Sequence, residues 1–480
     1  MKQKFFYVIA LFILVSCENS ALINPYSKAP VNHTSGYIPT KKEVMELSFL
    51  TPEEELLIPL SGIDNSLGDL FDIALNNNPS TRSSWLDAKA SAASYGESLS
   101  TYLPSLSFDG EFNANQEGFI FTLPDADSTF LMNDQIQYGP IVSLSYLLFD
   151  GGERKAKAGK YFWLLQESNY LHNENVQSVM KTVANNYYIF LSYSAQYDAD
   201  LEDLQDAEAT YQASSEKYKA GIYAVTDMLQ AKTNYLQKKV NLTNQKNLKD
   251  NSYISLITTL GIPANTHLNL HQFPKEILPC PFEMGVGELI EVAKKHRGEY
   301  LAAKSSYLSA AADVKISEGE LLPKLNLIAT AGEYWYQGGF QDSGNYNIAL
   351  DLSFPIFTGF YYQNQIKNKK SLLAQAKTAM YAAQLNIIED VHLAMNDLSS
   401  AKEKIQDTKS YLDAAEIEAK AMFKRYKLGI VTILDLLSAQ SFLADAKAQY
   451  IVAQQEYYSA IVSVAFATGM LSAQNIGGYR

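Results

Sequence analysis

Four stretches of the chain alternate between apolar and polar residues. The clearest is 135–149, where apolar side chains hold almost every even position from Ile136 to Leu148, and the odd positions include Gln135, Gln137, Ser143 and Ser145. The same alternation runs through 105–115 and 345–357, and more weakly through 324–336. A period of two predicts β-strands with one apolar and one polar face. The longer stretches also reach the roughly 9–11 tilted residues that a membrane-spanning strand needs.

Four strands are too few to close a barrel by themselves, and lipid does not tolerate the open edges of a sheet. Two interpretations follow. Either several chains pool their strands in a membrane, or the hairpins lie outside the membrane in a small sheet. The strand lengths and the tyrosines near the strand ends favour pooled strands, because aromatic residues gather at membrane interfaces.

Between the strand stretches, apolar residues recur in steps of four and three. One such stripe runs from Val176 to Leu204 and is interrupted at Ser194, and an equivalent stripe runs from Ile388 to Leu412. A mean period of 3.5 is typical of coiled-coil packing. The pattern predicts two long helices, 151–219 and 360–427, each about 100 Å long at ~1.5 Å per residue. Shorter helices are expected at 67–102, 225–260, 286–321 and 432–468.

The two halves of the chain repeat one unit. "KYKAGIYAVTDMLQA" at 217–231 matches "RYKLGIVTILDLLSA" at 425–439, which lies 425 − 217 = 208 residues further on. We therefore divide the chain into repeat 1 (67–261), a link (262–285), repeat 2 (286–469) and a tail (470–480). Each repeat should contain a short helix, a β-hairpin, a long helix, a glycine turn and a second short helix.

The N-terminus, "MKQKFFYVIALFILVSC", has a basic start and an apolar core from Phe5 to Val15. That core is too short to span a membrane as a helix, so residues 1–16 are read as an export signal. The sequence Leu14-Val15-Ser16-Cys17 is similar to a bacterial lipobox, which makes Cys17 the expected lipidation site and 17–66 an anchor and linker. The alternative is an ordinary secretion signal with an incidental cysteine.

Composition narrows the classes of function. The net charge of −13 argues against a nucleic-acid partner. Once Cys17 is lipidated, Cys280 is the only other cysteine, so an intrachain disulfide is not expected. The sequence contains no phosphate-binding loop, nucleophile elbow or cysteine cluster. We expect a protein that is not an enzyme and that has no cofactor and no metal site.

Taken together, the lipobox, the tandem repeat, the strand ends "LLFDGG" and "FPIF" and the paired "YKxGI" turns resemble the TolC family of outer-membrane efflux proteins. The resemblance covers about 67–470. It implies a mainly α fold with a transmembrane β-barrel, in which a homotrimer pools four strands per chain and continues the barrel as a long coiled-coil α-helical barrel.

In function, the resemblance implies a passive exit channel of a tripartite efflux pump. Such a channel lies in the lipid of the outer membrane of a Gram-negative-type bacterium, reaches into the periplasm, and docks onto a membrane-fusion adaptor and an inner-membrane transporter. Two alternatives stay open: an exit duct for type I protein secretion, and a lipid-anchored coiled-coil spacer between envelope layers.

The resemblance also places a gate at the glycine turns. It implies that Tyr426 bonds to Asp227, that Thr226 precedes this carboxylate, and that Asp435 contributes to an acidic ring. The chain departs from the family pattern at Val431, where the family has an arginine, and at a second ring carboxylate, where the chain has Ser438. Arg425 or Lys424 are candidates to replace the missing charge, and we expect a closure held by hydrogen bonds.

Local helix chemistry gives the same residues a second reading. Gly221 and Gly429 are placed to end their helices in the left-handed conformation. Thr432 and Asp435 have the spacing of a capping pair at the start of the next helix. Residues at the turns can serve as caps, as a gate, or as both.

Overall fold

The computed structural model describes residues 64–121, 129–221, 224–273, 277, 282, 284–337 and 343–471. All of them belong to one of the two units of the chain, Leu57–Arg480. The predicted export signal, the lipidation site Cys17 and the linker up to residue 63 lie outside the described residues, as do residues 472–480 of the predicted tail.

The elements follow one order twice, once in each half of the chain. The first half contains β1 (Asp64–Asn65), α4 (Leu67–Asn77), α5 (Pro79–Ser100), β2 (Ser105–Phe121), β3 (Thr129–Phe149), α6 (Glu153–Lys219) and α7 (Val225–Thr259). The second contains β4 (Asn269–Leu270), α8 (Val286–His296), α9 (Gly298–Gly319), β5 (Lys324–Gln337), β6 (Ser343–Ser353), α10 (Tyr361–Lys427) and α11 (Ile433–Ala467). Corresponding helices have equal lengths: 11 residues in α4 and α8, 22 in α5 and α9, 67 in α6 and α10, and 35 in α7 and α11.

The prediction of a single helix at 67–102 was wrong, because the structure has two helices that are separated at Asn78. This residue has φ −71° and ψ 122°, which is extended backbone. The cause is Pro79, which has no N–H to donate and disfavours a helical conformation in the residue before it. The Asn78 side chain then caps α5 by accepting a hydrogen bond from the N–H of Ser80 at 2.8 Å.

The single helix predicted at 286–321 was also wrong, and here no proline marks the break. Arg297 is extended, with φ −68° and ψ 119°, and only 2% of it is exposed. Its guanidinium lies 3.2 Å from both Glu299 and Asp390 and 3.5 Å from Glu174. It also lies over the ring of Phe466, 4.6 Å from the centroid. The break therefore places a buried charge among carboxylates from α6, α9 and α10, which offset the cost of its burial.

The four long strands form one antiparallel sheet in the order β2-β3-β5-β6, so β2 and β6 are its edges. The two hairpins are in equivalent register: Phe112 lies opposite Tyr138 in the first, and Ala331 lies opposite Tyr346 in the second. Both edge strands expose large apolar side chains within one chain. Those that the structure describes are Leu106, Phe108 and Phe112 on β2, and Tyr346, Ile348, Leu350 and Leu352 on β6.

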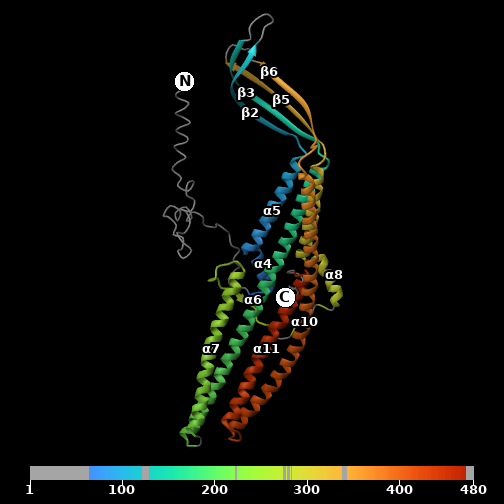
Figure 1. Ribbon diagram of the computed structural model, residues 1–480. Helices are drawn as coiled ribbons and strands as arrows, with labels where there is room; N and C mark the ends of the chain where they lie inside the picture. The colour runs from blue at the N-terminus through green and yellow to red at the C-terminus, as the bar shows by residue number, and fades with distance from the viewer. Residues whose placement is uncertain are drawn as a thin grey trace. The chain divides into compact units, whose positions relative to one another are not determined.

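Within this unit the sheet lies beyond one end of the helices, and the α6–α7 and α10–α11 turns lie at the other (Figure 1). The apolar core is concentrated between these ends. One cluster joins α4, α6 and α7 around Phe71, Val183 and Leu256, and another joins α8, α10 and α11 around Leu289 and Ile387. Stacked rings of Tyr188 and Tyr458, with centroids 5.2 Å apart, connect the two repeats.

Across the described ranges, none of the helices combines the length and the apolar character that crossing a membrane requires.

Candidate functional site

Both glycine turns lie at the end of the helices farthest from the sheet (Figure 1). Gly221 and Gly429 have φ of 72° and 74°, the left-handed region that favours glycine. After Gly429, the N–H of Ile430 donates to the carbonyl of Arg425 at 2.9 Å, and the Gly429 N–H donates to the Tyr426 carbonyl at 3.0 Å. These two bonds form a Schellman motif, which satisfies the last carbonyls of α10. The predicted helix-ending conformation of both glycines is confirmed.

The second turn carries the predicted capping pair. Thr432 Oγ1 accepts from the Asp435 N–H at 3.3 Å, and the Asp435 carboxylate accepts from the Thr432 N–H at 2.9 Å and from its hydroxyl at 2.7 Å. These hydrogen bonds from Thr432, together with the charge of Arg425, lower the pKa of Asp435. The start of α11 is thus fixed by a capping box.

The first turn lacks an equivalent cap. The residue before α7 is Ala224, which offers no side-chain hydrogen bond. Thr226 is exposed and Asp227 is half-buried in the first turn of α7. Within the described residues, the Asp227 carboxylate has no hydrogen-bond partner. The contact implied for Asp227 and Tyr426 is therefore not made inside one chain, and it stays a prediction for the assembled protein.

Tyr426 is instead anchored to α6. It is 2% exposed, and its hydroxyl lies 2.8 Å from Ser214 Oγ. The Lys217 ammonium donates to the Tyr426 carbonyl at 3.2 Å and lies 4.7 Å from the ring centroid. Tyr426 therefore joins the end of α10 to the end of α6. Sequence reasoning missed Ser214 and the role of Lys217, although Ala207, Thr210 and Ser214 follow a helical spacing of small residues that indicates a close helix contact.

Val431 and Ser438, the two departures from the family pattern, do not carry charge into the turn. Val431 packs against the apolar cluster of Ala231, Tyr426, Ile433 and Leu436, while Ser438 is exposed. Arg425 and Lys424 are also exposed. Within one chain, the turn region is thus held by apolar packing and by the hydrogen bonds of Tyr426, and the closure of a gate there stays a prediction.

Further from the turns, polar contacts join the α6–α7 pair to α11. Gln440 donates to Thr210 Oγ1 at 3.4 Å. Lys447 of α11 lies 3.0 Å from Glu202 and 3.6 Å from Asp203, and Lys238 of α7 lies 2.6 Å from Asp203. Three helices therefore meet at one cluster of charges.

The pKa values of this cluster reflect its partial burial. Burial by itself would lower the pKa of Lys447, but Glu202 and Asp203 reverse this and raise it. Burial raises the pKa of the neighbouring carboxyls Asp200 and Asp206. Among the residues that the structure describes, no group of three or more His, Cys, Asp or Glu is placed to hold a metal ion.

Comparison with known proteins identifies relatives of the whole arrangement. The family model described as outer membrane efflux protein matches residues 70–262 and 289–470. The outer membrane protein TolC of Salmonella enteritidis is 24% identical over 441 residues, which cover 87% of this chain and 84% of that protein. Protein CyaE of Bordetella pertussis is 22% identical over 422 residues, 86% of each chain.

Solved structures share the fold. The outer membrane protein VceC of Vibrio cholerae superimposes with a TM-score of 0.71 at 16% identity, covering 84% of this chain and 96% of that one. The outer membrane channel CmeC of Campylobacter jejuni gives a TM-score of 0.71 at 17% identity, covering 88% and 93%.

Proposed function

The chain belongs to the outer membrane efflux protein family, and on that premise we propose that it is the exit channel of a tripartite efflux pump. Three copies form a passive duct through the outer membrane and the periplasm. A periplasmic adaptor opens the duct at the glycine turns, and an inner-membrane transporter supplies the energy. Cys17 carries the lipid anchor.

The observation that carries this proposal is the pair of unpaired sheet edges. Strands β2 and β6 expose apolar side chains, and within the described residues each also has one edge whose backbone groups pair with no strand, which lipid does not tolerate. Pairing β6 of one copy with β2 of the next removes every edge once the ring closes. The apolar strand faces then contact lipid, and the polar faces line a wet interior.

The internal repeat supplies the register of this pairing. Within the chain, β3 of repeat 1 pairs with β5 of repeat 2, and Val142 lies opposite Ala331. The equivalents of these residues are Leu350, at 142 + 208, and Phe112, at 331 − 219. Leu350 of one copy should therefore lie opposite Phe112 of a neighbouring copy.

The turns form the gate in this proposal. Tyr426, held on Ser214 and Lys217, keeps α10 against α6. The Asp227 carboxylate, which has no hydrogen-bond partner within the described residues, is available to a neighbouring copy. Thr226 and Asp435 lie beside these residues at the same end of the helices. Opening requires α10 and α11 to move away from α6, which breaks the contacts of Tyr426 and Lys447.

Single-channel recording in planar bilayers tests the function. The purified lipoprotein should insert and conduct ions weakly by itself, and a cognate adaptor should raise the conductance. A coiled-coil spacer would pass no ions with or without the adaptor, and that result would refute the channel. Tyr426→Phe and Asp227→Ala test the gate separately: both should raise the adaptor-free conductance, and unchanged conductance would remove these residues from the gate.

A further inference from the structure

The connection from β6 to α10 exposes a cluster of large apolar side chains, which we call the junction cluster: Ile356, Phe357, Phe360 and Tyr361. Their exposed fractions are 90%, 77%, 63% and 62%. The rings of Phe357 and Phe360 meet edge to face, with centroids 5.8 Å apart. The cluster directly continues the apolar face of β6, which ends in Leu350 and Leu352.

Phe360 occupies an unfavourable backbone conformation. Its φ is 64°, and it is the one non-glycine residue with positive φ in the described part of the chain. The equivalent position in repeat 1, 360 − 208 = 152, is Gly152 with φ 88°. A glycine satisfies this turn without strain, so Phe360 presents an aromatic ring at a cost in stability. Strained backbone conformations of this kind are concentrated at positions where the side chain has a function.

The repeat indicates how a neighbouring copy would approach Phe360. In repeat 1, the connection from β3 to α6 packs against repeat 2 of the same chain. A Cβ added to Gly151 in this connection would lie 2.6 Å from the Leu322 side chain. Yet a Cβ on Gly152 would meet nothing within 4 Å. In the trimer, Leu103 of the next copy would take the place of Leu322 against Gly359. By the same equivalence, the Cβ of Phe360 would have no close neighbour there, and its ring is 63% exposed within one chain.

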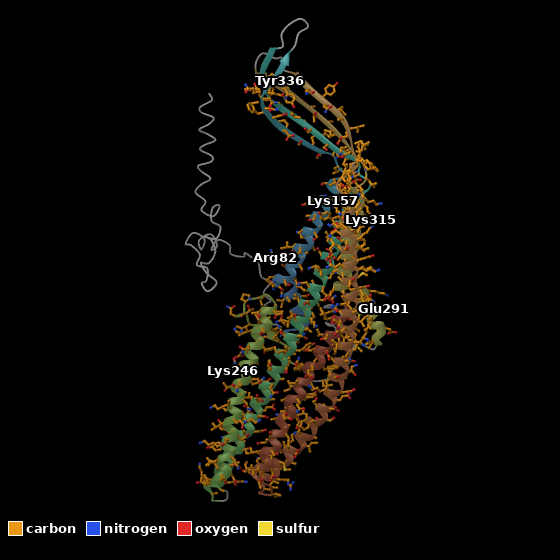
Figure 2. The ribbon with its side chains drawn as sticks, in the orientation of Figure 1. Arg82, Lys157, Lys246, Glu291, Lys315 and Tyr336 are labelled. Carbon is orange, nitrogen blue, oxygen red and sulfur yellow. The ribbon has the colours of Figure 1, made fainter. Side chains whose placement is uncertain are left out.

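The helix surface below the junction cluster is basic. No Asp or Glu occurs from 361 to 388, whereas Lys367, Lys369, Lys370 and Lys377 do, in a chain whose net charge is −13. Lys369 and Lys370 pair with α9 carboxylates at 3.4 Å. Lys367 is exposed, has no ion pair within the described residues, and lies seven residues after Phe360 on the same helix face. Lys157 of α6 lies in the part of the helices close to the sheet (Figure 2).

We propose that the junction cluster inserts into the boundary between headgroups and acyl chains of the periplasmic leaflet, with Lys367 bound to the phosphate of an anionic phospholipid. This inference rests on the proposed membrane channel. Aromatic rings suit this boundary because they are apolar with a weakly polar periphery, and a lysine one or two turns away reaches the phosphates. The contact fixes the height of the helices relative to the membrane.

Fluorophores attached at single cysteines test the insertion, with Cys280→Ser as background. The full chain is placed in vesicles of phosphatidylethanolamine and phosphatidylglycerol, and Phe360→Cys carries the label. Lipids with a nitroxide on the headgroup should quench this label several-fold more strongly than a label at Lys246→Cys, which lies on α7 far from the sheet (Figure 2). Quenching by aqueous iodide alone would show a periplasmic or luminal position, and quenching by neither would show cover by another copy. Both results overturn the proposal.

A second label separates this inference from the channel itself. Ile348→Cys, on the apolar face of β6, should be quenched by nitroxides deep in the acyl chains. If Ile348 is quenched and Phe360 is not, the strands span the membrane and the junction cluster does not anchor them. If lipid quenches neither position, the proposed channel fails as well.

Charge substitutions test the phosphate contact. Phosphatidylglycerol added to detergent micelles should raise the unfolding temperature of the wild type, and Lys367→Gln should lose most of that rise. Lys377→Gln is the matched control: an exposed lysine of the same helix, about 15 Å further from the sheet at ~1.5 Å per residue. Equal responses of the two variants would exclude a specific role for Lys367.

Discussion

At the residue scale, Tyr426 indicates how the proposed gate could close without the family arginine. Its ring lies in an apolar cluster with Val431, and its hydroxyl contacts Ser214 across the helix pair. A buried hydrogen bond between two helices is present when the helices are packed together and absent when they separate. Each such bond stabilises the packed state by about 1 kcal/mol. If these residues form the proposed gate, its closure should depend little on salt, because Val431 contributes apolar packing in place of a charge.

Ser214→Ala should loosen this closure. Loss of about 1 kcal/mol would shift the closed–open equilibrium by roughly fivefold. We expect a higher open probability without adaptor in single-channel recordings. Ser215→Ala, one residue further along α6, is the control and should behave as the wild type. Equal open probabilities of all three proteins would show that the Ser214 contact carries no gating energy.

The capping box at Thr432 and Asp435 predicts a dependence on pH. The pKa of Asp435 is lower in the folded protein, so its stabilising effect is fully present above the unfolded pKa of about 3.9 and is lost as pH falls through the folded value. Asp435→Asn should lower the unfolding temperature at neutral pH and make no difference at strongly acidic pH. Parallel thermal melts across that range check this, and a difference that persists in acid would assign the effect to something other than the carboxylate charge.

At the element scale, the sequence predicted the two long helices but missed two helix breaks and the contacts between residues distant in the chain. The long helices begin within two residues of the predicted starts, because the heptad pattern and the glycines that precede them are local signals. The break at Asn78 was visible in Pro79 and was overlooked. The break at Arg297 had no local signal, because it depends on carboxylates of α6 and α10, which are distant in sequence. Ser214 was missed for the same reason: its partner lies 212 residues away.

The charge cluster around Lys447 yields a prediction at this scale. Lys447→Gln removes the ion pairs that join α11 to α6, which should speed amide hydrogen exchange in the middle of α11 about fivefold for a loss of about 1 kcal/mol. Lys404→Gln is the control, because Lys404 pairs with Glu456 at 2.7 Å within the α10–α11 pair and does not bridge to α6. Similar exchange in both variants would mean that Lys447 does not hold the two pairs together.

At the scale of the whole molecule, the repeat predicts that a contact inside one chain has an equivalent between copies of the proposed trimer. If β6 pairs with β2 of the next copy in the register of β3 with β5, then Leu350→Cys and Phe112→Cys in one chain should oxidise to intermolecular disulfides. Denaturing gels should then show covalent trimers. Leu350→Cys with Phe108→Cys is the control, because Phe108 lies four residues, or about 13 Å, further along the strand. Cross-linking of the control alone would indicate a shifted register.

The equal lengths of α6 and α10, and of their partners α7 and α11, restrict how this protein can change in evolution. Both turns must reach the same level, since a shortened α6 alone would lift Ser214 away from Tyr426. An insertion or deletion in one half is tolerated only with a matching event in the other, and in multiples of seven residues that preserve the packing stripe. The length of the duct can therefore change only in steps of seven residues, and each step has to occur in both halves of the chain.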